Sequence, residues 1–338
     1  MTAQSAATAE TIWARFPHFK CQFLRRFRKF TKRLKLFGEP VDRRTRSKQM
    51  RGRRTSVSPD TGRGPVRCHD NRSVWSMQVS GKTIIVTGGA SGIGRALCEA
   101  LHQAGAKTVI VADLDLQAAQ SVAHTIAGSA FRCDVAQESD VKALIEKIEL
   151  EFGPIDLYCS NAGVALGFSP RVDNAAAGPD HLWQTAWSVN VMGHVYAARH
   201  LVPRMKARGG GYFLITVSAA GLLTQIGSAI YTTTKHAAVG FAENLAIAHK
   251  DDGVKVSILC PQAVDTPLLH RLPQGPQSGD GILSAELVAQ AAIDGIGHET
   301  FLILPHAEVN DYMRRKAEDR DRWINGMARL QRRIFIED

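Results

Sequence analysis

The sequence predicts an α/β fold with a doubly wound, mostly parallel sheet of seven strands and helices on both faces. Two observations support this prediction. From Val79 to about residue 305, short apolar runs alternate with segments of helical length and period, which is typical of repeated strand–helix–strand units. The apolar runs are continuous rather than alternating, as expected for parallel strands that are covered on both faces.

The strands are expected in the apolar runs, and the helices in the periodic segments between them. The expected strands are KTIIVTG (82–88), TVIVAD (108–113), SAFRCDV (129–135), IDLYCSNAG (155–163), YFLITVS (212–218), VKVSILCP (254–261) and FLILP (301–305). The expected helices are 92–104, 115–127, 138–151, 181–207 and 231–250. Residues 307–338 are predicted to end the chain as a charged helix, whose Tyr312, Trp323, Met327 and Leu330 could face the body or a partner.

The charge divides the chain into a basic extension and a mildly acidic body. Residues 1–76 carry 19 Lys and Arg against five Asp and Glu, whereas the rest of the chain carries 23 against 27. The net charge of +10 therefore belongs to the extension, and we expect no nucleic-acid binding by the body. The six cysteines are scattered without a CxxC pair, which argues against a disulfide framework or a metal site and favours a reducing, cytoplasmic location.

The basic extension contains a helical pattern between residues 12 and 37. Its apolar stripe consists of Phe16, Phe19, Phe23, Phe27, Phe30, Leu34 and Phe37, and the intervening face is rich in Arg and Lys. Residues 40–75 have the composition of a disordered segment. Three interpretations stay open: a helix that contacts a membrane surface, an organellar targeting sequence, or an upstream start before a natural beginning at Met77.

A glycine-rich turn follows the first expected strand and opens the first expected helix. It reads TGGASGIG, from Thr87 to Gly94, and such a turn brings backbone N–H groups and a helix N-terminus against a pyrophosphate. Asp113 ends the next strand, where a carboxylate accepts hydrogen bonds from the adenosine ribose and repels a 2′-phosphate. The sequence therefore predicts a Rossmann-type, dinucleotide-binding domain over residues 77–306 that prefers NAD, with NADP the less favoured cofactor.

Further motifs follow in a fixed order. They are SNAG (Ser160–Gly163), SVNVMG around Asn190, TVSAAG around Ser218, YTTTK (Tyr231–Lys235) and PQAVDTP (261–267). Together with the glycine-rich turn, this arrangement resembles the short-chain dehydrogenase/reductase superfamily between about Ser80 and Pro305. The chain departs from the family pattern at Ser160, where asparagine is usual, and at Gln262, where glycine is usual.

The resemblance implies a catalytic set of Asn190, Ser218, Tyr231 and Lys235 that interconverts a secondary alcohol and a ketone. Tyr231 would act as general acid/base, since hydride transfer to or from an alcohol carbon requires a proton to leave or return. Lys235, one helical turn along, would lower the phenol pKa and bind the nicotinamide ribose. Ser218 would stabilise the substrate oxygen, and Asn190 would bend its helix and hold a water in a proton relay.

The residues expected to contact the cofactor come from the ends of several strands. They are Gly88, Ser91, Gly92, Ile93, Gly94, Asp113, Asp134, Val135, Asn161, Ala162, Gly163, Tyr231, Lys235, Pro261, Val264 and Thr266. Ser91 and Leu114 occupy positions where NADP-preferring relatives often carry a basic residue. An NADP-dependent carbonyl reductase and a non-catalytic dinucleotide-binding regulator remain the alternatives.

The substrate pocket is expected between two loops, 164–180 and 265–284. Their apolar residues are Val164, Leu166, Phe168, Leu268, Leu269, Leu272, Ile282 and Leu283, which suit a lipophilic alcohol or ketone. The stretch QGPQSGDG (274–281) has the composition of a flexible hinge. Family members are usually dimers or tetramers built on the helices that follow Asn190 and contain Tyr231, so we expect a homodimer or homotetramer.

Overall fold

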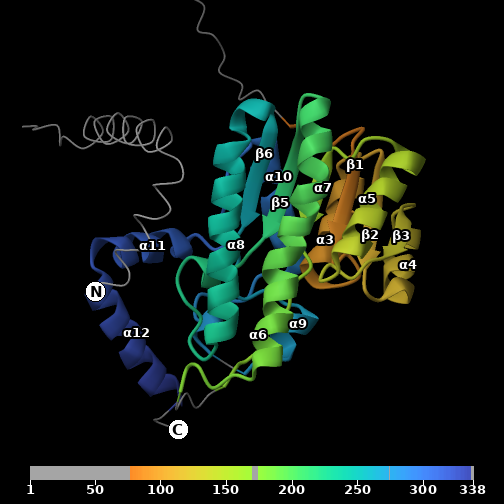
Figure 1. Ribbon diagram of the computed structural model, residues 1–338. Helices are drawn as coiled ribbons and strands as arrows, with labels where there is room; N and C mark the ends of the chain where they lie inside the picture. Colours follow the sequence, from red (N-terminus) through yellow and green to blue (C-terminus); the bar gives the residue numbers. More distant parts are fainter. Residues whose placement is uncertain (1–76, 170–173, 274, 336–338) are drawn as a thin grey trace, which may run out of the picture. The chain divides into compact units, whose positions relative to one another are not determined.

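A seven-stranded parallel sheet forms the centre of the described part of the chain. The structure, a computed structural model, describes residues 77–169, 174–273 and 275–335. All neighbouring strands are parallel, and their order is β3-β2-β1-β4-β5-β6-β7 (Figure 1). The order reverses between β1 and β4, so the sheet has its topological switch point there, at the place where open α/β sheets bind ligands. The predicted fold class is confirmed.

The strands and helices alternate along the chain as expected. The strands are β1 (Thr83–Thr87), β2 (Thr108–Asp113), β3 (Ser129–Arg132), β4 (Leu157–Ser160), β5 (Gly211–Thr216), β6 (Val254–Leu259) and β7 (Leu302–Ile303). The helices are α3 (Gly92–Gln103), α4 (Leu116–Thr125), α5 (Glu138–Phe152), α6 (Asp180–Trp187), α7 (Gly193–Ala207), α8 (Ala229–Ala248), α9 (Pro267–His270), α10 (Ala285–Gly297), α11 (Glu308–Glu318) and α12 (Arg320–Phe335).

Two apolar layers hold the helices to the sheet. On one face, α3, α4 and α10 bury residues such as Leu97, Val122 and Val288 against the strands. On the other face, which carries α7 and α8 in Figure 1, helices α5, α7 and α8 bury a second set that includes Ile145 and Leu201. Successive strand residues point to opposite layers, which explains why these strands read as unbroken apolar runs.

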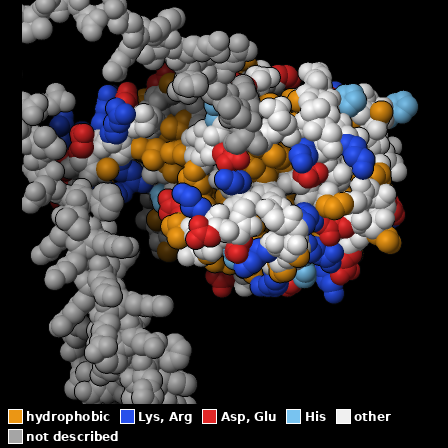
Figure 2. All heavy atoms as spheres, turned by 90° about the horizontal axis from the view of Figure 1, so that it is seen from above, with side chains coloured by type: hydrophobic (Ala, Val, Ile, Leu, Met, Phe, Trp, Pro, Cys, Tyr) orange, Lys and Arg blue, Asp and Glu red, His pale blue; other side chains and the backbone are white. Residues whose placement is uncertain are grey.

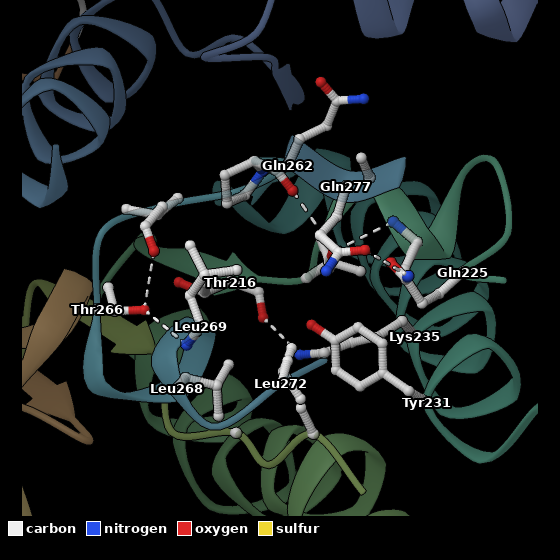
Figure 3. Close-up of a pocket in the computed structure, with 18 of the residues that line it drawn as sticks. Thr216, Gln225, Tyr231, Lys235, Gln262, Thr266, Leu268, Leu269, Leu272 and Gln277 are labelled. Carbon is white, nitrogen blue, oxygen red and sulfur yellow. Dashed lines mark hydrogen bonds between the residues drawn. The ribbon is translucent and has the colours of Figure 1, made fainter. Parts of the chain in front are cut away.

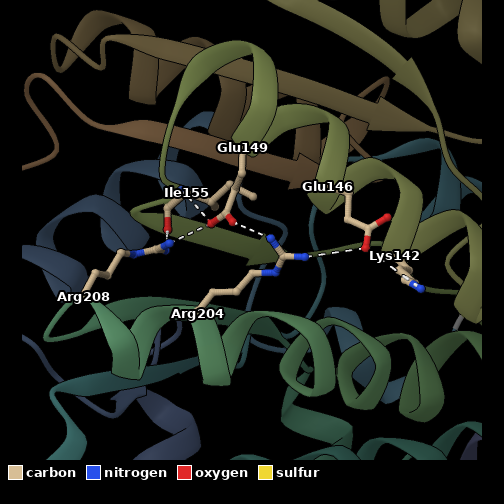
Figure 4. Close-up of polar contacts among 6 residues, drawn as sticks. All are labelled: Lys142, Glu146, Glu149, Ile155, Arg204 and Arg208. Atoms are coloured by element: carbon tan, nitrogen blue, oxygen red, sulfur yellow. Dashed lines mark hydrogen bonds and ion pairs between the residues drawn. The ribbon is translucent and has the colours of Figure 1, made fainter.

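Ion pairs join α5 to the end of α7. Glu149 on α5 accepts hydrogen bonds from Arg204 Nη1 at 2.9 Å and Arg208 Nη1 at 2.7 Å (Figure 4). Arg208 also donates to the carbonyl of Ile155, and Arg204 lies 3.6 Å from Glu146. Burial works against the charge of Glu149, but the two guanidinium groups hold the pKa of this carboxyl below its usual value. The network fixes α7, which follows directly from Asn190.

The expected helix 181–207 is interrupted at Asn190. The structure divides it into α6, a π-helical turn at Ser188–Met192, and α7. Asn190 lies within this turn and is completely buried. A π-helical turn widens the backbone locally and is frequent at functional sites. The interruption thus replaces the regular α-helical backbone hydrogen bonds, as shown by the Gly193 N–H, which bonds to the carbonyl of Ser188 five residues earlier.

The C-terminal segment forms two helices instead of the single helix that was predicted. Asp319 leaves the helical conformation, with φ −146° and ψ 97°, and its Oδ1 accepts a hydrogen bond from Arg322 N at 2.9 Å. An aspartate in this conformation caps the next helix, which explains the break between α11 and α12. The sequence contained this signal, but the charged pattern around it hid the boundary.

The surface of the described part is mixed in charge. On the face seen in Figure 2, basic and acidic side chains are interspersed. In the described ranges, no helix is both long and apolar enough to cross a membrane. The basic extension, with the helical pattern expected at 12–37, lies outside the residues that the structure describes.

Candidate active site

The glycine-rich turn connects β1 to α3 and is clamped by the residues that follow β4. Asn161 Nδ2 donates to the carbonyl oxygens of Thr87 at 3.0 Å and Gly88 at 3.3 Å. Thr87 Oγ1 accepts from the Asn161 N–H at 3.0 Å. A Cβ atom on Gly94 would lie 1.9 Å from the Gly88 oxygen, so only glycine fits at the start of α3. These contacts fix the turn so that backbone N–H groups remain available at the N-terminus of α3, as an anion site requires.

Asp113 ends β2 beside this turn and is half-buried. Its Oδ2 accepts from Ala90 N at 3.0 Å, and its Oδ1 accepts from Asp115 N at 3.1 Å. The carboxylate therefore shapes the glycine-rich turn in addition to lining the cavity. Neighbouring Leu114 is 58% exposed and also lines the cavity, so a hydrophobic side chain stands beside the carboxylate.

Tyr231 and Lys235 lie in the first two turns of α8, which begins at the Ser228 cap. Ser228 Oγ accepts the Tyr231 N–H at 3.1 Å, fixing where the helix starts. The Lys235 ammonium lies 5.7 Å from the centre of the Tyr231 ring and donates to the Thr216 carbonyl at 3.3 Å (Figure 3). Both side chains point into the same cavity, as the spacing of YTTTK predicts.

The pKa values of this pair are governed by burial. Burial raises the pKa of Tyr231 above its usual value, and a hydrogen bond with the Ser218 hydroxyl opposes part of that rise. Burial lowers the pKa of Lys235 to about 8. The sequence predicted that the ammonium would lower the phenol pKa, but in the structure of the protein alone burial dominates. The raised pKa favours the protonated phenol, which is the form that acts as an acid.

Ser218 lies just after β5, at the start of a short 3₁₀ turn (Ala219–Gly221). Its Oγ accepts from Ala220 N at 3.1 Å and lies 3.4 Å from the carbonyl of Pro261. Because the turn holds this oxygen, the hydroxyl is directed beside Tyr231 at the cavity wall. The structure therefore brings Ser218, Tyr231 and Lys235 together, although Ser218 belongs to a different element.

Asn190 lies behind the cavity wall and is occupied by protein contacts. Its Oδ1 accepts from Val164 N at 2.9 Å, and its Nδ2 donates to Val164 O at 2.9 Å and Thr234 Oγ1 at 3.1 Å. A Cβ atom on Gly163 would lie 3.3 Å from Asn190 Oδ1 and 3.4 Å from Lys235 Nζ. Both donor hydrogens of the Asn190 amide are therefore used to hold the segment after β4 and the α8 helix.

Apart from Asn190, every predicted catalytic and cofactor-contacting residue lines one cavity of about 1060 Å³. It contains each of the sixteen residues expected at the cofactor, together with Ser218. Of the apolar residues predicted for the substrate, Val164, Leu166, Phe168, Leu268, Leu269 and Leu272 line it. The prediction is wrong for Ile282 and Leu283. Ile282 is 55% exposed, and Leu283 pairs with Val264 and packs into the layer below α10.

Sequence reasoning missed several residues of the cavity and its support. Thr216 supplies the carbonyl that holds Lys235, and Thr234 holds Asn190. Thr234 could have been found, because it lies three residues after Tyr231 and so shares its helix face. Gln225 and Gln277 meet across the cavity, with 3.1 Å between Gln225 Nε2 and Gln277 Oε1 (Figure 3). That contact holds Gln277, in the described part (275–281) of the stretch that was expected to be a hinge.

The SNAG motif contains a departure that the structure explains. Ser160 Oγ lies 2.6 Å from His194 Nδ1, and both residues are buried. Burial, followed by the nearby charge of Lys235, lowers the pKa of His194 to about 3. The imidazole of His194 beside Ser160 is thus neutral. His194 lies one helical turn after Asn190 and adds no charge to the site.

The sequence profile described as short chain dehydrogenase matches residues 82–277, more than half of the chain. The chain belongs to this family. A 1-deoxy-11-beta-hydroxypentalenate dehydrogenase from Streptomyces exfoliatus is 34% identical over 72% of this chain and 90% of its own length. A 2,5-dichloro-2,5-cyclohexadiene-1,4-diol dehydrogenase from Sphingobium indicum is 38% identical over 57% of this chain and 76% of its own length.

Two solved structures share the fold, and the first is a short-chain dehydrogenase/reductase. One from Burkholderia phymatum, in complex with NAD, has a TM-score of 0.63 and 29% identity, covering 72% of this chain and 96% of that one. A 3-ketoacyl-(acyl-carrier-protein) reductase from Brucella melitensis, complexed with NADH, has a TM-score of 0.62 and 27% identity, covering 67% and 97%. This short-chain dehydrogenase is an NAD(P)-dependent enzyme that acts on CH–OH groups of alcohols, or on the corresponding ketones.

Proposed function

We propose that this short-chain dehydrogenase interconverts a secondary alcohol on a carbocycle and the corresponding ketone, with NAD as cofactor. The observation that carries the proposal is the convergence of Ser218, Tyr231 and Lys235 on the cavity that also contains the glycine-rich turn and Asp113. The relatives support the choice of substrate class, because two of them are named for a cyclohexadiene diol and a 3beta-hydroxysteroid.

The cavity fits a dinucleotide at its glycine-rich end. Gly88 and Gly92 have φ values of +63° and +51°, and a Cβ atom on them would lie 2.8 Å from Ala162 Cα and 3.0 Å from Thr266 Cγ2, so glycine allows this tight turn. Asp113 supports NAD over NADP, because a carboxylate accepts from ribose hydroxyls and repels a 2′-phosphate. The relatives from Burkholderia and Brucella were solved with NAD and NADH, which agrees with this preference. The bound nicotinamide would accept or supply the hydride.

The side chains around Tyr231 have complementary roles in the proposed reaction. Tyr231 takes the hydroxyl proton of the alcohol, or returns it to the ketone oxygen, as general acid/base. Ser218 donates a hydrogen bond to the same oxygen as charge develops on it. Lys235 places a positive charge 5.7 Å from the phenol ring, which favours the phenolate as it forms. Asn190 positions α8 through its hydrogen bond to Thr234, and its part in a proton relay stays a prediction, since its side-chain amide is already engaged.

Turnover of cyclohexanol tests this proposal directly. The wild-type protein should reduce NAD with cyclohexanol, and Tyr231→Phe should lower kcat by about 100-fold or more. The substitution keeps the ring, which packs 5.8 Å from the Phe168 ring, so NAD affinity and the unfolding temperature should not change. Tyr196→Phe on α7 is the matched control and should retain activity. A kcat for Tyr231→Phe within a few-fold of wild type would contradict the role of Tyr231.

We also propose a homodimer or homotetramer built on α7 and α8. The family supports this proposal, since its members are usually dimers or tetramers built on these helices, and Ile247, near the end of α8, is 77% exposed and so can serve as the test position. Light scattering on wild type and Ile247→Lys measures the assembly. A wild-type mass equal to one chain would rule out the proposal.

A further inference from the structure

The C-terminal helix α12 contributes one wall of the cavity that contains Tyr231. Its lining residues are Trp323, Met327 and Leu330, which are spaced four and three residues apart and therefore form one stripe along the helix. All three are half-buried, whereas Ile324 on another side of the helix is 57% exposed. The apolar stripe of α12 thus faces the space where substrate would bind.

Trp323 packs against the segment that follows Ser218. Its side chain packs against a small apolar cluster of Ala219, Leu223 and Val309. Ala219 directly follows Ser218, and Leu223 lines the cavity. A ligand whose oxygen lies at Ser218 and whose skeleton extends past Leu223 therefore meets Trp323 next.

A buried lysine holds the C-terminal helices in this position. Lys316 on α11 is 9% exposed, and its Nζ donates to the carbonyl oxygens of Leu222 at 2.7 Å and Leu223 at 2.6 Å. The same ammonium lies 3.4 Å from His236 Nε2 on α8, while the His236 Nδ1–H donates to Thr232 O at 3.0 Å. Hydrogen bonds from a charged donor are stronger than neutral ones, so α11 is fixed to the segment that follows Ser218.

A second contact joins α11 to the loop on the other side of the cavity. Tyr312 Oη donates to Asp280 Oδ1 at 2.8 Å, and Tyr312 and Trp323 pack with their ring centres 6.4 Å apart. Residue 280 belongs to the loop 265–284, which also supplies Leu268, Leu269 and Leu272 (Figure 3). The two apolar walls are therefore held together across the cavity.

We propose that α12 is the outer wall of the substrate site and selects alcohols and ketones whose carbocyclic skeleton extends beyond a single ring. This inference rests on the proposed function, since it assigns the substrate class of the same site. A single ring at Ser218 and Tyr231 leaves α12 untouched. A second ring covers Trp323 and Leu330 and removes apolar surface from water, which increases binding in proportion to the area covered.

The test compares cyclohexanol with 4-cyclohexylcyclohexanol in the full-length protein. We expect a higher kcat/KM for the two-ring alcohol, and a fall of about tenfold or more in that value for Trp323→Ala and for Leu330→Ala. In these two variants, the kcat/KM for cyclohexanol should stay within about twofold of the wild-type value. Ile324→Ala, on the exposed side of α12, is the matched control, and its kcat/KM for each of the two alcohols should also stay within about twofold of wild type. A two-ring to one-ring ratio that is unchanged in both cavity-facing variants overturns the inference.

Two further measurements separate the possible failures. Calorimetry measures the binding of 4-cyclohexylcyclohexanone to wild type and to Trp323→Ala, each saturated with NADH. Binding that is weakened by Trp323→Ala, without turnover of either alcohol by the wild type, supports the role of α12 and refutes the proposed function. Turnover of both alcohols by the wild type, with a two-ring to one-ring ratio that is unchanged in the variants, supports the proposed function and refutes the role of α12. If the variants lose kcat/KM equally for both alcohols and their oligomeric mass also changes, a second copy of the chain covers α12. This result overturns the inference.

Discussion

Replacing Asp113 with asparagine should change the cofactor preference without dismantling the glycine-rich turn. The Asp113 carboxylate accepts hydrogen bonds from Ala90 N and Asp115 N, so an alanine would remove support for the turn together with the charge. Asparagine deletes the charge but keeps one acceptor oxygen, which can retain the hydrogen bond from Ala90 N, while its Nδ2 cannot accept from Asp115 N. Asp113→Asn therefore removes the charge with less loss of support for the turn than an alanine would cause.

The size of the effect follows from the position of the carboxylate. Two unit charges about 4 Å apart interact with about 4 kcal/mol at an effective dielectric constant of about 20. Asp113 is half-buried and open to the cavity, so screening leaves roughly 2 kcal/mol of repulsion against a 2′-phosphate, or about 30-fold. Weaker hydrogen bonds to the ribose cost NAD about 1 kcal/mol. The ratio of kcat/KM for NAD to that for NADP should thus fall by about 100-fold.

Initial rates with both cofactors and one alcohol measure this ratio in wild type, Asp113→Asn and Asp113→Asn/Leu114→Arg. The double variant should favour NADP further, and that additional gain should shrink as salt is added, because Leu114 is exposed. Asp115→Asn is the matched control. Asp115 caps α4 by accepting from Ala118 N at 3.0 Å and does not line the cavity. Equal use of the two cofactors by the wild type, or a ratio that Asp113→Asn leaves unchanged, would refute the reasoning.

Three other predictions concern the turn, the pH profile and the C-terminal anchor. Gly94→Ala should abolish NAD binding in calorimetry, because its Cβ would lie 1.9 Å from the Gly88 oxygen. In contrast, a Cβ on Gly240 of α8 would lie in open space, so Gly240→Ala should raise the free energy of unfolding by about 0.5–1 kcal/mol. The rate of alcohol oxidation should increase from pH 7 toward pH 10, and the rate of ketone reduction should decrease over the same range. The reason is that burial raises the pKa of Tyr231, while oxidation requires its phenolate. An optimum for oxidation below neutral pH would contradict this prediction. Lys316→Met should lower the free energy of unfolding by about 2 kcal/mol in urea titrations, since it leaves two buried carbonyl groups without their charged donor. Arg314→Met at the exposed surface should have no measurable effect, and equal stabilities of the two variants would refute the anchor.

The sheet and the nucleotide turn could be predicted because their signals are local. Each buried parallel strand is an unbroken apolar run, and the turn from Thr87 to Gly94 lies between a strand and a helix in eight consecutive residues. Strand order then follows from the alternation of strands and helices and from the few topologies that short connections allow. Boundaries were less certain, as the break at Asp319 illustrates, since a single capping residue decides it.

The sequence by itself determined the α/β fold, the family and the residues Asn190, Ser218, Tyr231 and Lys235 as the candidate catalytic set. Only the tertiary structure decided that the Asn190 amide is engaged by Val164 and Thr234, that burial raises the pKa of Tyr231, and that α12 lines the cavity. These properties depend on the direction of side chains and on desolvation by segments far apart in the chain. Such effects arise when distant elements pack, so a motif of a few residues cannot specify them.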